Sequence, residues 1–476
     1  MKKISFVTAT LLAFIVILVM AVGGSGCANI VPPSGGPRDS IPPLLLKTTP
    51  GDSTRNFKGN KITFTFDEFI DVDNPSENLL ISPSPKSQPV VDHKLNTLTL
   101  KIKDTLENNT TYTIQFGRTV KDFNEGNVLQ NLVYTFSTGP YIDSLQLKGN
   151  VILAETGKID TTLIVMLHTS ANDSAVVKER PRYFTKLNGQ GEFVFTNLPP
   201  KTFYIYTLKD NNGTRRYLDE KQLFGFADKP VSLSDTVKPV TLYAYSESET
   251  TVQATTSPAS GNRNRRGPGD VADKRLKLQT NLVNNQQDLL SPLFISTDKP
   301  LRSFDSTKLN LYSDSAFNVV TDYQFVKDSS NKKIVLQNKW KEHTLYHIIL
   351  DKDFAVDEEG KKLLRNDTIS FTTKKITDYG SVKLTIRNVD MSKNPVLQFI
   401  AGNQLYKSYP LRSNTFNEDI FLPGEYELRI LYDDNKNGRW DPGVFFGKHR
   451  QPEIAKPIER KINIKPSWKN EFDISL

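Results

Sequence analysis

Apolar residues alternate with polar ones through most of the chain, and this pattern constrains the fold more than any other feature. Side chains of a β-strand point alternately to two faces, so a period of two predicts strands buried on one face only. Glycine, proline, asparagine and aspartate separate these segments, and no long segment with a helical period interrupts them. An apolar fraction of 37% over 476 residues is low for one large core and fits several small sheets, so we expect several all-β domains. The clearest alternating runs are Ile62, Phe64 and Phe66; Leu98, Leu100 and Ile102; Tyr112, Ile114 and Phe116; and Leu132, Tyr134 and Phe136.

The chain repeats itself in two halves. Residues 110–127 (TTYTIQFGRTVKDFNEGN) align with residues 344–361 (TLYHIILDKDFAVDEEGK), which places both Tyr112 on Tyr346 and Gly126 on Gly360 at a displacement of 234 positions. Later in each half, NLPPKTFYIYTLKDNNG aligns with FLPGEYELRILYDDNKNG. Two repeats in the same order predict four domains in the arrangement A, B, linker, A′, B′.

The segment from Ser246 to Arg275 separates the halves. It has no periodicity and few large apolar residues, so we expect a mobile linker. Its Arg263, Arg265 and Arg266 could instead bind an anionic partner, but a solvated linker is the simpler interpretation. Positive charges elsewhere are spread out and do not form a stripe, so the net charge of +8 gives little support to nucleic-acid binding.

Cys27 is the only cysteine of the chain and follows an apolar N-terminus. Lys2 and Lys3 form a positive n-region, residues 4–22 are mostly apolar, and small residues lead up to Cys27, as in a secretory signal. The apolar run could also span a bilayer as an uncleaved helical anchor, or the cysteine could be incidental. The proline- and glycine-rich segment after Cys27 predicts a stiff tether to the first domain.

The N-terminal pattern resembles a bacterial lipoprotein signal, with Ser25 and Gly26 at lipobox positions and Gly24 where leucine is usual. The resemblance implies cleavage before Cys27, which removes both lysines and leaves a net charge of +6, and acylation of its thiol, for example by palmitate. No free thiol would then remain for disulfides or zinc.

The A unit resembles the SbsA-type bacterial Ig-like domain in its C-terminal half, and the A′ unit is a weaker match that keeps Tyr346, Gly360 and Phe371. The B units, through LNGQGEFVFTNLPPKTFYIYTLKD and LPGEYELRILYDD, resemble the carboxypeptidase-regulatory, transthyretin-like β-sandwich. The residues of the A unit at the pattern positions are Tyr112, Asp122, Gly126, Asn127, Phe136 and Thr138.

The whole chain is similar to a group of outer-membrane lipoproteins of Bacteroidota. This resemblance implies an outer-membrane location and a membrane partner held through the lipid. Surface export in that group is associated with acidic residues soon after the cysteine, whereas the first acid here is Asp39, which favours the periplasmic face. The expected organisation is a signal peptide (1–26), a tether (27–44), an Ig-like domain (45–139), a transthyretin-like sandwich (140–245), a linker (246–275), a second Ig-like domain (276–375) and a second transthyretin-like sandwich (376–476).

One loop carries a candidate metal site. In DDNKNGRWDPG, oxygen-bearing side chains take positions 1, 3, 5 and 9 of a calcium loop, and Gly438 takes position 6, where a sharp turn is needed. Position 12 is Val444, so the usual bidentate glutamate is missing, and a plain turn would be rich in the same residues. The loop is therefore a candidate site for a structural Ca²⁺, and no cofactor is required. The candidate ligands are Asp433, Asn435, Asn437 and Asp441, and the first copy retains Asp210, Asn212 and Asp219.

No catalytic motif is evident, and we expect no catalytic residues. His343 and His347 have a helical metal-pair spacing, but in a strand they would lie about 13 Å apart at about 3.3 Å per residue, too far to share a zinc ion. Carboxylate pairs such as Asp67 with Glu68 and Asp433 with Asp434 are better explained as turn residues than as a glycosidase pair.

These observations predict a non-enzymatic envelope lipoprotein whose β-sandwiches bind envelope proteins or act as a scaffold. The alternative is a carbohydrate-binding lipoprotein that presents Trp340, Trp440 or Trp468 to a glycan. A hydrolase is the third and least favoured class.

Overall fold

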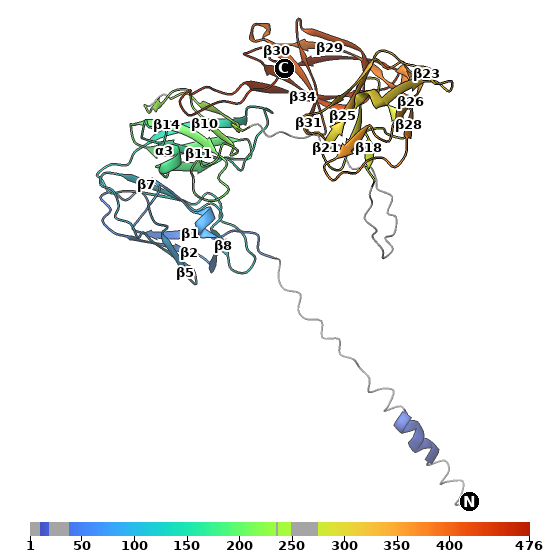
Figure 1. The fold of residues 1–476 in the computed structure, drawn as a ribbon. Helices are drawn as coiled ribbons and strands as arrows, with labels where there is room; N and C mark the ends of the chain where they lie inside the picture. Colours follow the sequence, from blue (N-terminus) through green and yellow to red (C-terminus); the bar gives the residue numbers. More distant parts are fainter. Residues whose placement is uncertain (1–9, 19–37, 235–236, 249–274) are drawn as a thin grey trace, which may run out of the picture. The chain divides into compact units, whose positions relative to one another are not determined.

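The computed structural model describes residues 10–18, 38–234, 237–248 and 275–476. Strands dominate it, which confirms the all-β prediction (Figure 1). The chain forms two compact units, residues 1–142 and residues 143–476. A short helix covers residues 10–18, and no helix within the described ranges is long and apolar enough to cross a membrane.

The first unit contains a β-sandwich with an aromatic core. In β2, Ile62, Phe64 and Phe66 are fully buried while the residues between them are not, as the alternating pattern requires. One sheet has the order β1 (Leu45–Thr49), β2 (Lys61–Phe66), β6 (Thr97–Lys101), β5 (Val90–Lys94), and the other has β4 (Leu80–Ser82), β7 (Thr111–Gln115), β9 (Val133–Ser137). Strands β3 (Ile70–Val72) and β8 (Val120–Asp122) form a separate pair, and α2 covers Pro75–Asn78.

The third sandwich repeats this topology. Its strands are drawn in yellow and orange in Figure 1. One sheet has the order β18 (Leu278–Thr280), β20 (Leu293–Thr297), β25 (Lys333–Asn338), β24 (Tyr323–Lys327). The other has β19 (Gln286–Gln287), β28 (Asp367–Thr373), β26 (Leu345–Leu350), β22 (Leu309–Ser313), β23 (Asn318–Val319). Strand β21 (Leu301–Phe304) pairs with β27 (Ala355–Asp357), and the 3₁₀ turn η1 (Ser306–Lys308) connects β21 to β22.

The second sandwich differs from these because its first strand pairs in parallel with its last strand. Strand β10 (Leu145–Leu153) lies between β13 (Glu192–Leu198), which is antiparallel, and β17 (Val240–Ala244), which is parallel. The facing sheet has the order β12 (Tyr183–Lys186), β11 (Ile164–His168), β14 (Thr202–Leu208), β15 (Phe224–Phe226), with β16 (Val231–Ser232) also paired to β14 and α3 at Ala175–Lys178.

The fourth sandwich repeats the second. Strand β29 (Gly380–Arg387) lies between the antiparallel β32 (Thr415–Phe421) and the parallel β35 (Lys469–Ser475). The facing sheet has the order β31 (Gln404–Pro410), β30 (Pro395–Ala401), β33 (Gly424–Tyr432), β34 (Ile454–Ile464), and η2 (Ile376–Asp378) and η3 (Met391–Lys393) are short 3₁₀ turns. The duplicated arrangement of sandwiches predicted from the repeats is therefore present.

One hydrogen-bonded corner shows the repeat at the level of single atoms. The Tyr112 hydroxyl accepts the backbone N–H of Glu107, and the Tyr346 hydroxyl accepts that of Lys341. In the same places, the Thr138 hydroxyl donates to the Glu107 carbonyl and the Thr373 hydroxyl donates to the Lys341 carbonyl. The same side chains close the same loop in both copies. Each of the four sandwiches has its own cluster of buried apolar side chains.

Candidate functional site in the Asp433 to Glu453 loop

The candidate calcium residues lie in a long loop between two paired strands. Strands β33 and β34 are antiparallel neighbours, with Tyr432 opposite Ile454, so the loop from Asp433 to Glu453 leaves the sheet and returns to the same place. This connection is the segment that carries DDNKNGRWDPG.

Asp433 organises the first turn of this loop. Its side chain is only 1% exposed, and its carboxylate accepts the backbone N–H groups of Lys436 (2.6 Å), Asn437 (3.3 Å) and Gly438 (2.6 Å). Lys436 and Gly438 both have left-handed backbone conformations, with φ values of 64° and 76°. The aspartate therefore replaces the hydrogen bonds that such a tight turn cannot make within its own backbone.

The other three candidate ligands meet at one carboxylate. The side-chain amides of Asn435 and Asn437 donate to Oδ2 of Asp441 at 2.6 and 2.7 Å. The carbonyl oxygens of these amides accept the backbone N–H groups of Asn437 and Arg439. The fold thus brings the four candidate residues together in one loop. Their side-chain oxygens accept hydrogen bonds from N–H groups of that same loop. Within the described residues, no group of three or more histidine, cysteine, aspartate or glutamate side chains has a geometry that could hold a metal ion.

Glu453 also belongs to this loop, although it is not among the ligands predicted from the sequence. Its side chain is 6% exposed, and its carboxylate accepts the backbone N–H groups of Asp434 (2.8 Å) and Asp441 (3.0 Å). Burial, together with the charges of Asp433 and Asp441, raises the pKa of this carboxyl. Glu453 lies too far along the chain from Asp433 to fit a calcium-loop spacing, so only the return of β34 to β33 could have revealed it.

The equivalent loop of the second sandwich, between β14 and β15, is organised differently. Asp210 accepts the backbone N–H of Arg215, and Asp219 accepts that of Lys221. Asn212 is exposed. Each aspartate therefore holds a separate turn in this copy.

The Asp433 to Glu453 loop also contacts the second sandwich through aromatic rings. Phe445 is 2% exposed and packs against Tyr206, Phe224 and Phe226, with ring centroids 5.1 to 5.6 Å apart. Phe446 is stacked with Tyr217 at 6.1 Å. Burial of a large aromatic ring such as Phe445 contributes about 1.5–3 kcal/mol, so this contact holds the two sandwiches together.

Polar contacts surround these rings. The backbone N–H of Phe445 donates to Glu247, the side-chain amide of Gln451 donates to the Phe226 carbonyl, and Nε2 of His449 lies 2.9 Å from the Asp173 carboxylate. Contacts of this kind fix the orientation of the loop on the second sandwich.

A second contact between the same sandwiches lies at the turn after β10. The backbone N–H of Ala455, in β34, donates to the carbonyl of Ala154 at 2.9 Å, and Lys158 forms an ion pair with Glu427 at 3.0 Å. Gly157 has a φ of +67°, and a Cβ atom at this position would overlap Cδ of Pro457. Only glycine allows the turn to approach β34 this closely.

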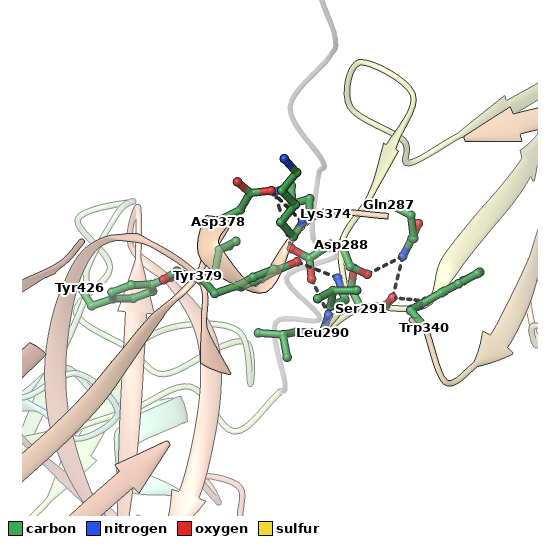
Figure 2. A network of polar contacts seen from close by, with 12 residues as sticks. Gln287, Asp288, Leu290, Ser291, Trp340, Lys374, Asp378, Tyr379 and Tyr426 are labelled. Atoms are coloured by element: carbon green, nitrogen blue, oxygen red, sulfur yellow. Dashed lines mark hydrogen bonds and ion pairs between the residues drawn. The ribbon is translucent and has the colours of Figure 1, made fainter. Parts of the chain in front are cut away.

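A network of polar contacts joins the third and fourth sandwiches (Figure 2). The hydroxyl of Tyr379, just before β29, accepts the backbone N–H of Leu289 at 2.7 Å. The side-chain amide of Gln287 donates to the carbonyls of Asp288 and Ser291, and the indole N–H of Trp340 also donates to Ser291. The loop after β19 is therefore tied both to its own sandwich and to the next one.

The three tryptophans have different surroundings. Trp340 packs edge-on against Tyr346 and Phe371. Trp440 donates its indole N–H to the Glu453 carbonyl and packs against a small buried cluster that includes Leu431. Trp468 is 62% exposed, with the Lys465 ammonium 5.0 Å from its ring centroid. Trp468 is therefore the tryptophan that offers a ring face to solvent.

The remaining residues singled out from the sequence have structural contacts. His347 lies in β26, with Nδ1 2.8 Å from the Ser370 hydroxyl and its ring stacked on Phe317, whereas His343 precedes the strand in a left-handed conformation. Asp67 accepts the backbone N–H of Leu44. Burial and the nearby charges of Asp122 and Asp67 raise the pKa of Glu68.

Cys27 and the arginines Arg263, Arg265 and Arg266 lie outside the described residues. The first three residues of the expected linker are described, and both Ser246 and Ser248 donate hydrogen bonds to the Glu220 carbonyl. At the other end of the first half, residues 38–44 of the expected tether contact the first sandwich through Arg38 and Leu44.

Comparison with known proteins identifies one part of the chain. Residues 39–138 match the family of bacterial Ig-like domains. This range is the first sandwich, in which Asp122, one of the residues on which the resemblance rests, accepts the backbone N–H groups of Glu125, Gly126 and Asn127. No curated protein matches the chain.

The solved structures to which the chain shows a weak similarity include an S-layer protein and a pilin subunit. The N-terminal part of the bacterial S-layer protein SbsC is 14% identical with a TM-score of 0.16, covering 35% of this chain and 40% of the S-layer chain. BcpA, the major pilin subunit of Bacillus cereus, is 10% identical with a TM-score of 0.17, covering 69% of this chain and 99% of the pilin. The Bacillus anthracis TIE protein is 11% identical with a TM-score of 0.14, covering 93% of this chain and 75% of the TIE protein. No functional conclusion follows at such TM-scores.

Proposed function

We propose that the protein is a non-catalytic lipoprotein of the cell envelope that binds other proteins through its β-sandwiches. In this proposal Cys27 carries the lipid, the chain resides on the periplasmic face of the outer membrane, and the protein belongs with the Bacteroidota lipoproteins that it resembles. The second and fourth sandwiches then correspond to carboxypeptidase-regulatory-like units. In these two sandwiches the first strand pairs in parallel with the last strand, which it does not do in the first and third, and this difference supports the distinction.

A single observation carries the binding role. Three large apolar side chains, Phe69, Leu95 and Phe123, are 55%, 59% and 66% exposed on neighbouring segments of the first sandwich. The backbone N–H of Phe123 donates to the Phe69 carbonyl, and that of Ile70 donates to the Leu95 carbonyl, which places the three segments side by side. We call these three residues the apolar tip. Exposed apolar clusters of this kind are typical of contact sites.

The charges beside the apolar tip favour a protein partner over a lipid surface. Asp67 and Glu68 precede Phe69, and Glu125 follows Phe123. Burial, together with the charges of Asp122, Asp67, Asp39 and Glu125, raises the pKa of Glu68, so Glu68 lies in a negatively charged environment. A negatively charged membrane surface would be repelled by this environment, whereas a protein with lysine or arginine around an apolar side chain would be attracted to it.

The test is crosslinking at the apolar tip in cells. A photoreactive amino acid at position 123 of the full-length chain should crosslink to one major protein, and Glu68→Lys combined with Glu125→Lys should reduce the adduct. The same photoreactive group at exposed Val319, in the third sandwich, is the matched control and should not give that adduct. Crosslinks to lipid alone, or the same adduct from both positions, would contradict the proposed binding role.

Carbohydrate binding is the second candidate, because Trp468 presents an exposed ring face. A glycan array probed with the exported chain should give a signal that Trp468→Ala abolishes if this role applies. A hydrolase remains the least supported class.

A further inference from the structure

A cavity of about 420 Å³ lies where the turn after β10 meets β33 and β34. Apolar side chains from both sandwiches line one part of it, Leu153 from the second and Ile400 and Pro457 from the fourth, and the remaining lining includes the polar residues Thr156, Lys158, Asn403, Glu427, Glu459 and Lys461. The cavity is thus bounded by two segments far apart in the sequence, and its volume falls within the range of small-molecule sites.

One buried positive charge lines this cavity. Arg429 is in β33, where Leu428 and Ile430 point into the core of the fourth sandwich, so its side chain leaves the opposite face of the sheet. Arg429 is 8% exposed, and its Nε donates to Oε1 of Gln398 at 2.6 Å, itself 1% exposed. Burial lowers the pKa of this guanidinium.

The carboxylates near Arg429 do not pair with it. Glu427 lies in the cavity wall, but its carboxylate is 3.0 Å from the Lys158 ammonium and 3.3 Å from that of Lys461. Glu155, on the turn after β10, contributes to the electrostatic environment of Arg429 without forming an ion pair. Among the described residues, therefore, Arg429 has a neutral amide partner and no carboxylate partner within ion-pair distance.

A buried charge without a counter-ion is strongly unfavourable, and a ligand that supplies the counter-ion recovers part of this cost. The guanidinium presents parallel N–H groups, which match the two oxygens of a carboxylate. The apolar side chains of Leu153, Ile400 and Pro457 match an aliphatic chain.

We propose that this cavity binds a small aliphatic carboxylate, whose carboxyl group pairs with Arg429 and whose hydrocarbon part packs against Leu153, Ile400 and Pro457. Because the second and fourth sandwiches both contribute to the walls, the bound acid stabilises their contact. This inference does not depend on the lipid anchor or on the proposed protein partner.

The experiment measures binding of octanoate to the full exported chain by isothermal titration calorimetry. Octanoate should bind, whereas octanamide, which has the same length without the charge, should bind at least tenfold more weakly. Arg429→Met should weaken octanoate binding at least tenfold, and Arg429→Lys should retain more affinity than Arg429→Met. Arg460→Met is the matched control, because Arg460 lies in β34 with its guanidinium over Phe472, and this variant should bind octanoate normally.

Three outcomes would overturn the proposal. They are the absence of octanoate binding to the wild-type chain, equal binding of octanoate and octanamide, and equal binding of inorganic phosphate and octanoate, which would indicate a general anion site. If Arg429→Met fails to fold, as judged by circular dichroism, the comparison of octanoate with octanamide on the wild-type chain still decides the question. Saturating octanoate should also raise the melting temperature of the wild-type chain and not that of Arg429→Lys to the same extent.

Discussion

The backbone N–H of Ala455 donates a 2.9 Å hydrogen bond to the carbonyl of Ala154, joining β34 of the fourth sandwich to the turn after β10 of the second. Gly157, which follows Ala154 by three positions in the same turn, lies against Pro457. Sandwiches that are separated by the whole third domain in the sequence therefore meet at a contact that permits no side chain at position 157.

The variant Gly157→Ala tests this contact. A new Cβ would overlap the rigid proline ring and lie 2.8 Å from the Ala455 carbonyl oxygen, so we expect separation of the turn from β34 and a loss of stability of about 2–4 kcal/mol. Gly213→Ala is a matched control, because Gly213 has the same φ of +67° and a Cβ added there would meet nothing within 4 Å. It should lose only the backbone contribution of about 1–2 kcal/mol. Equal losses in urea unfolding would show that the contact with Pro457 is unimportant.

His168 should make the second sandwich sensitive to acid. It is 2% exposed in β11, and burial lowers its pKa to about 4. The unfolded chain, with a histidine pKa of about 6.5, then binds a proton that the folded chain does not, so stability falls as the pH drops from about 6.5 towards 4. The contribution of this group at pH 4 is about 3 kcal/mol. The variant His168→Leu should lose correspondingly less stability than the wild type between pH 7 and pH 4, measured by urea unfolding. Parallel losses in the two proteins would contradict a neutral buried imidazole.

Calcium binding at the Asp433 to Glu453 loop predicts a change in thermal stability. If Asp433, Asn435, Asn437 and Asp441 hold Ca²⁺, EDTA should lower the melting temperature of the exported chain and added Ca²⁺ should restore it. Asp441→Asn should reduce this response. Glu453→Gln should reduce it as well if the buried carboxylate takes the place of the missing position 12. A melting temperature indifferent to EDTA would identify the loop as a turn held by its own hydrogen bonds.

Acylation predicts a chemical signature at Cys27. Metabolic labelling with a fatty-acid probe should mark the wild-type protein, and Cys27→Ser should remove the label because no other thiol exists in the chain. Equal labelling of the two proteins would exclude lipid attachment at this residue.

Protease access tests both the linker and the membrane face. Trypsin should cleave first at Arg263, Arg265 or Arg266 and leave two stable fragments, and it should do so only after the outer membrane is permeabilised. Cleavage in intact cells would place the chain on the cell surface. Early cleavage within the second sandwich would show that the linker begins elsewhere.

Local sequence patterns were sufficient to predict the fold class, because the alternation of apolar and polar residues within a strand indicates which of its faces is buried. In β2 the buried residues are Ile62, Phe64 and Phe66, the alternating set predicted from the sequence. Tyr112 and Tyr346 close equivalent loops in the first and third sandwiches. Periodicity and repeats are properties of short segments, so they can be recognised without any knowledge of the neighbours in space.

Contacts between distant segments could not be predicted in this way. Glu453 joins the Asp433 loop only because β34 pairs with β33, and Phe445 is buried only because its loop lies on β14 and β15 of another sandwich. Arg429 lies between the core residues Leu428 and Ile430, so its side chain leaves the other face of β33. The tertiary structure covers that face with a turn from residues 153–158, and this burial converts a surface arginine into a buried charge without a carboxylate partner among the described residues. Hydrophobic periodicity indicates which face of a strand is buried in the core of its own domain. The packing of one domain on another depends instead on the shapes and charges of two surfaces, and these surfaces form only when the complete chain has folded.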